Sequence, residues 1–122
     1  MALSKKWALL EHTDSPEDPI GLHFDFLLED NHGCRSWRLR QMPILDGPPQ
    51  EAIPIAVHSL EWLEISEREG SGGRGWAKRL ITGFFSGELP DNDIDPVEIK
   101  LYSKEMSGSL EIKNFRFKFS SL

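Results

Sequence analysis

Three histidines and one aspartate are the residues whose types and spacing could support metal or phosphate chemistry. His23 and Asp25 lie two positions apart in an alternating segment, so on a strand both side chains leave the same face. An imidazole nitrogen beside a carboxylate oxygen can bind a divalent metal such as manganese or zinc. His12 ends the preceding apolar run and would add a third ligand if that run is a neighbouring strand. The alternative is that Asp25 only orients His23 on a solvent-exposed face.

Other side chains that could contact an anion lie further along the chain. His58 follows the apolar run 53–57 and could be a phosphate ligand, a general acid or an edge residue without a chemical role. The glycine-rich segment 69–75 lacks the Gly-Lys-Ser/Thr ending of a P-loop, so it is either an anion-binding nest beside Arg74 or a hairpin turn. Cys34 has no base beside it in sequence, and a structural thiol is expected.

The elements that must position these residues are mostly strands. Segments 22–28 and 34–39 alternate apolar and polar residues around the turn 30–33, which predicts a hairpin. The proline-rich residues 43–54 are interpreted as a loop or an excursion of an edge strand, and 55–65 as one or two extended segments. Segment 76–85 has helical spacing, but Gly75 and Gly83 bracket so short a run that a strand is favoured. Near the C-terminus, strands are predicted over 97–101 and from 110 onward, with a phase slip around 113–114 typical of a β-bulge.

Composition narrows the class of protein. The 122 residues are 39% hydrophobic and 28% charged, which predicts one globular domain over 1–122 and excludes disordered, collagen-like and coiled-coil chains. The single cysteine excludes an intrachain disulfide, and the apolar run 7–10 is too short for a membrane span, so we expect a cytoplasmic protein without a membrane partner. The net charge of −6 argues against indiscriminate nucleic-acid binding. The fold expected is mainly β, a small single-domain β-barrel with short flanking helical segments and loops.

Five blocks in order resemble a known family. They are His12, His-Phe-Asp-Phe-Leu-Leu-Glu at 23–29, Arg-Ser-Trp-Arg-Leu at 35–39, Val-His-Ser-Leu-Glu-Trp at 57–62 and Met-Ser-Gly-Ser-Leu at 106–110. Together they resemble the 3′-phosphoesterase domain of bacterial ligase D proteins and its stand-alone relatives. The resemblance implies a compact β-barrel and a manganese-dependent hydrolase that removes 3′-phosphates or 3′-ribonucleotides during DNA repair. It implies that His12, His23 and Asp25 hold the metal and that His58 contacts the scissile phosphate, with His23 and His58 as catalytic residues. The implied partners are a DNA or RNA 3′ end and DNA-repair proteins.

The sequence departs from the family pattern at two site positions. Leu27 stands where the family strand carries an arginine, and Trp62 stands where it has a tyrosine. The linkage between His12 and His23 is also longer than in ligase D. Arg38, Arg40 and Arg74 are therefore the candidates for a substitute phosphate contact. The second hypothesis is a catalytically impaired relative that binds nucleic acid or protein, with Trp62 and Trp76 as contact residues.

Overall fold

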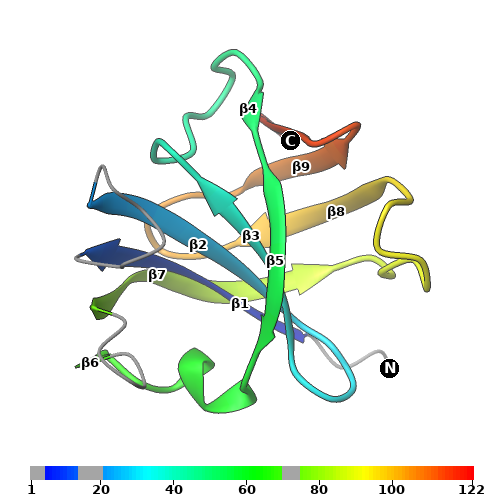
Figure 1. Cartoon of the computed structure of the whole chain (residues 1–122). Helices are drawn as coiled ribbons and strands as arrows, with labels where there is room; N and C mark the ends of the chain where they lie inside the picture. The colour runs from blue at the N-terminus through cyan, green and yellow to red at the C-terminus, as the bar shows by residue number, and fades with distance from the viewer. Residues whose placement is uncertain (1–4, 14–20, 70–74) are drawn as a thin grey trace.

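The computed structural model describes residues 5–13, 21–69 and 75–122, and these form one antiparallel sheet (Figure 1). Over these residues the chain has ten strands and a single turn of 3₁₀-helix, η1. In chain order the elements are β1 (Lys5–Thr13), β2 (Leu22–Glu29), β3 (Cys34–Leu39), β4 (Gln50–Glu51), β5 (Ile53–His58), η1 (Leu60–Leu63), β6 (Glu67–Glu69), β7 (Trp76–Ser86), β8 (Val97–Tyr102), β9 (Gly108–Lys113) and β10 (Arg116–Ser120). In the described part of the chain, no helix is long and apolar enough to cross a membrane.

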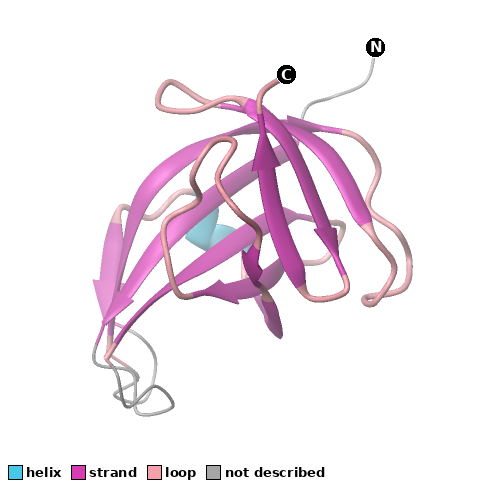
Figure 2. Ribbon diagram, turned by 90° about the horizontal axis from the view of Figure 1, so that it is seen from above, coloured by secondary structure: helices cyan, strands magenta, loops and turns pink. Residues whose placement is uncertain are grey.

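The expected mainly β class is confirmed, but the strands of the described residues form a strongly curled sheet that is not closed, so a barrel is not supported. Its strands follow the order β4-β10-β9-β8-β7-β1-β2-β3-β5, with β6 paired to β7. Figure 2 shows how far the strands curve round one another. The two ends of the path, β4 and β5, are separated only by Ala52, whose backbone N–H donates to the Phe115 carbonyl. At this residue the segment changes partner from β10 to β3, which breaks the ladder instead of closing it.

The central strands are buried on both faces. On one face of β2, Phe24, Phe26 and Leu28 join the main core, where the Phe26 ring lies 5.7 Å from Trp7 and 5.1 Å from Phe117. On the other face, His23 and Asp25 are 0% and 2% exposed. The interpretation of this second face as solvent-exposed is therefore wrong, because η1, β5 and a second apolar cluster cover it.

Several local predictions are confirmed and two are corrected. The hairpin of β2 and β3 closes through the Asp30 N–H and the Gly33 carbonyl, and residues 76–86 form the strand β7. The β-bulge at 113–114 is wrong: Asn114 and Phe115 have φ angles of 53° and 61° and form the two-residue turn between β9 and β10. The phase of the apolar residues shifts there because the chain reverses. The extended stretch predicted over 55–65 ends at His58, and η1 follows.

Candidate functional site

Antiparallel pairing of β1 with β2 brings two of the predicted ligands together. His12 lies directly opposite His23 in the register, so both side chains leave the same face of the sheet. Their rings meet edge to face, with centroids 4.8 Å apart. Asp25 follows two residues after His23 and therefore shares that face. His12 was expected to add a third ligand only if the apolar segment that it ends is a strand next to that of His23, and β1 is such a strand.

The three histidines converge on one carboxylate. The Asp25 oxygens lie 3.5 Å from His12 Nδ1, 3.2 Å from His23 Nε2 and 3.6 Å from His58 Nε2. These separations exceed the roughly 2.7–2.9 Å of a charge-assisted hydrogen bond. Within the described residues, the buried Oδ1 atom of Asp25 has no hydrogen bond of regular geometry. The three imidazole nitrogens therefore lie around the carboxylate at distances longer than those of strong hydrogen bonds.

The geometry of this cluster fits a metal ion. One ligand atom from each of His12, His23 and Asp25 can be chosen so that all lie within 4.8 Å of one another. Two ligands at about 2.1 Å from a common ion are separated by roughly 3–4 Å, so small side-chain rotations would bring these atoms around a cation. Two imidazoles and one carboxylate form a donor set of intermediate hardness, which suits manganese or zinc.

The electrostatics favour an ionised Asp25. Burial by itself would raise the pKa of this carboxyl, but the polar contacts of the three nearby imidazoles, His12, His23 and His58, with the carboxylate outweigh burial and hold the pKa well below its usual range. A carboxylate that is charged at neutral pH, buried and surrounded by imidazoles attracts a cation strongly. The site is therefore electrostatically prepared for a divalent metal.

His58 reaches the cluster from the end of β5. Its Nδ1 lies 3.1 Å from the carbonyl of Ala56, which orients the ring. When Nδ1 carries a proton and donates to that carbonyl, Nε2 faces the Asp25 carboxylate. His58 is thus placed either to join the metal ligands or to contact a group bound beside them.

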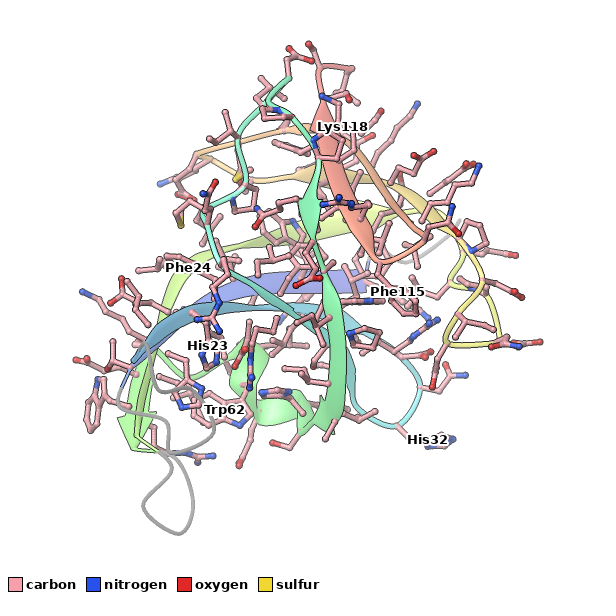
Figure 3. The ribbon with its side chains drawn as sticks, turned by 45° about the horizontal axis from the view of Figure 1, so that its top comes forward. His23, Phe24, His32, Trp62, Phe115 and Lys118 are labelled. Atoms are coloured by element: carbon pink, nitrogen blue, oxygen red, sulfur yellow. The ribbon has the colours of Figure 1, made fainter. Side chains whose placement is uncertain are left out.

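The cluster opens into a pocket of about 800 Å³. His12, Asp25 and His58 form its inner wall, and η1 contributes Glu61 and Trp62. In Figure 3, His23 and Trp62 lie on one side of β2 and Phe24 lies on the other, while His32 lies away from the site. A pocket of this volume accommodates a ligand of nucleotide size next to the histidines.

The arginines nominated from the sequence differ in position. Arg38 is opposite Asp25 in the register of β2 and β3, lines the pocket, and has a buried Nε without a hydrogen bond among the described residues. Arg40 is exposed, donates to the Leu22 carbonyl and is not part of the pocket wall. Arg74 lies outside the described residues. The flanking strands β6 and β7 pair, with Glu69 opposite Trp76, whereas residues 70–74 of the glycine-rich segment lie outside the described residues.

Sequence reasoning missed one arginine of the pocket. Arg68 on β6 lines it, with its guanidinium 4.6 Å from the centre of the Trp62 ring. The only sequence signal was a positive charge between two glutamates, and a three-residue strand is too short to reveal a face. The register of β6 against β7 was needed to place it.

The two departures from the family pattern are structurally different. Leu27 is fully buried, in an apolar cluster that also contains Leu10, Cys34 and Leu63. Trp62 is half-buried and forms part of the pocket wall. Trp76 is 43% exposed, donates from Nε1 to Glu67 and is not a lining residue.

Cys34 has the properties of a structural thiol. It is 0% exposed, and its Sγ lies 3.8 Å from the carbonyl of Ser59. Burial, with a smaller effect of the Glu29 charge, raises the pKa of the thiol to about 11. The nucleophilic thiolate is therefore essentially absent at neutral pH.

No protein-family model matches the sequence, and no curated protein matches it. The geometry of the site and the resemblance in its sequence blocks are the basis for a functional proposal.

Proposed function

We propose that the protein is a manganese-dependent phosphoesterase that acts on the 3′ ends of nucleic acids and removes a 3′-phosphate or a 3′-ribonucleotide. The observation that carries the proposal is the convergence of His12, His23 and His58 on the buried carboxylate of Asp25 at the wall of a pocket. The order of the sequence blocks supports the same class of reaction. As part of the proposal, the enzyme works in the cytoplasm on DNA or RNA ends, beside DNA-repair proteins.

In the proposed hydrolysis, the metal ligands, His58 and Arg38 have different roles. His12, His23 and Asp25 would hold a divalent metal, and such an ion would supply charge neutralisation at phosphate oxygens and a lower pKa for bound water. His58 points Nε2 toward the same space, where a protonated imidazole would donate a hydrogen bond to a phosphate oxygen. Arg38, opposite Asp25 in the register, would supply positive charge from the β3 side.

The direct test is a gel assay on a primer-template that ends in a 3′-phosphate, with manganese added. We expect conversion to a 3′-hydroxyl by the wild-type protein and its loss in His23→Ala, because the variant lacks one of the metal ligands. His32→Ala is the matched control, since His32 is an exposed turn residue away from the pocket. Conversion that persists in His23→Ala, or no conversion with manganese, zinc or magnesium, contradicts the proposal.

A binding module without turnover is the second candidate, and the burial of Leu27 favours it. The family that the sequence blocks resemble carries an arginine at that position, whereas Leu27 only packs in the apolar cluster. Tight binding of the 3′-phosphate end with no product in the gel assay would support this function over the enzyme.

A further inference from the structure

Arg68 lies in one row with the histidines across four strands. The register pairs Arg68 with Ala77, Ala77 with His12, and His12 with His23. Residues directly opposite one another leave the same face of a sheet, so all four side chains are on the face of the site. Neighbouring strands lie about 4.8 Å apart, which puts the Arg68 backbone roughly 10 Å from that of His12. Ala77, which lies between Arg68 and His12 in this row, contributes only a methyl group to the face.

The guanidinium of Arg68 is held in place by η1. It stacks over Trp62 at 4.6 Å, and its Nη2 donates to Glu61 Oε1 at 3.0 Å. Both partners lie on the same 3₁₀ turn and orient the group together, while the Arg68 side chain stays 43% exposed to solvent. Arginine carries five N–H donors, and this pairing uses one nitrogen. The remaining donors form a pre-oriented fork of the kind that binds phosphate oxygens in pairs.

The two arginines of the pocket flank the metal-ligand cluster. Arg38 lies on β3, Arg68 lies on β6, and His12, His23 and Asp25 lie between them on β1 and β2. We propose that Arg68 binds a phosphate oxygen of the substrate and supplies the positive charge that Leu27 does not. This inference rests on the proposed function, since it takes the ligand to be a phosphate ester. The competing account is that Arg68 only packs on Trp62 and pairs with Glu61 at the surface.

Calorimetric titration of inorganic phosphate, with and without manganese, separates the two accounts. We expect Arg68→Gln to weaken phosphate binding about ten- to a hundredfold, the loss typical of one charged hydrogen-bonding group. Arg68→Lys should fall between Arg68→Gln and wild type, because it keeps the charge and loses the fork. Arg116→Gln is the matched control: Arg116 is an exposed arginine on β10 outside the pocket.

The outcomes for Arg68 and for the proposed function are distinguishable. Equal phosphate affinity in wild type and Arg68→Gln, or no phosphate binding by the wild type, overturns the role of Arg68 even if the gel assay shows turnover. Phosphate binding that depends on Arg68, without turnover of a 3′-phosphate end, keeps the anion site and rejects the enzyme. Manganese affinity, measured in parallel, should be the same in Arg68→Gln and wild type, because Arg68 is not a ligand. A large loss of manganese affinity would assign the effect to a disturbed metal site and overturn a direct phosphate contact.

Discussion

Asp25 is a buried charge whose cost must be balanced by its neighbours. A carboxylate taken out of water loses several kcal/mol of hydration unless it is paired. Three imidazoles lie within 3.6 Å of its oxygens, and a bound cation would compensate the same charge more completely. Burying an ionised carboxylate among three imidazoles costs folding free energy. This cost supports the proposal that the cluster serves to bind a metal.

The burial of Leu27 predicts the effect of placing an arginine at this position, where the family that the sequence blocks resemble carries one. Leu27→Arg should lower the free energy of unfolding by about 3 kcal/mol or more, because it forces an unpaired charge into the apolar cluster below η1. It should not raise the rate of phosphate release. Urea unfolding and the gel assay measure the two effects.

Leu60→Arg is the matched control for that substitution. Leu60 lies on η1 and is 42% exposed, so the same change there should alter the free energy of unfolding by less than about 0.5 kcal/mol. A Leu27→Arg protein as stable as this control and more active than wild type would show that position 27 can still direct a cation into the site.

The turn between β9 and β10 determines the register of these two strands. Asn114 and Phe115 both occupy the left-handed region, as a two-residue hairpin turn of this hand requires. Asparagine tolerates that conformation, whereas a phenylalanine at φ 61° is strained. The strain is local because the ring of Phe115 is 55% exposed.

Relief of this strain should be measurable as stability. Phe115→Gly should raise the free energy of unfolding by about 1 kcal/mol relative to Phe115→Ala, since both remove the ring and only glycine accepts the positive φ without penalty. Urea unfolding of the two variants tests the difference. An alanine variant as stable as the glycine variant would mean that the turn changes conformation when the ring is removed.

At the scale of the whole molecule, charge limits which nucleic acids can bind. The chain carries a net charge of −6, and the two arginines proposed to bind phosphate, Arg38 and Arg68, line the pocket, so under the proposed function we expect a nucleic-acid end to bind there. A duplex that ends in a 3′-hydroxyl should bind at least about tenfold more weakly than the same duplex with a 3′-phosphate. Fluorescence anisotropy at physiological salt measures both affinities. Equal affinities would place the binding surface outside the pocket.

Prediction from the sequence succeeded where short-range periodicity determines structure. The alternation around His23 and Asp25 identified β2, and the turn residues 30–33 identified its hairpin with β3. The group of His12, His23 and Asp25 followed from residue chemistry and from block order. Prediction from the sequence failed where a short segment changes its partner strand or its direction, as at Ala52, at η1 and at the Asn114 turn. Segments of two to four residues are too short to show the periodicity of a strand or a helix.

The residue types by themselves determined the mainly β class, the central hairpin and the set of side chains able to hold a metal. Only the tertiary structure decided that the sheet stays open, that His58 joins the cluster from β5, and that Arg68 shares a row with His12 and His23. The physical reason is that the alternation of apolar and polar residues along the sequence indicates only which residues share a face of one strand. Which strands become neighbours, and in what register, depends on the packing of the whole core, which is distributed over residues far apart in the chain.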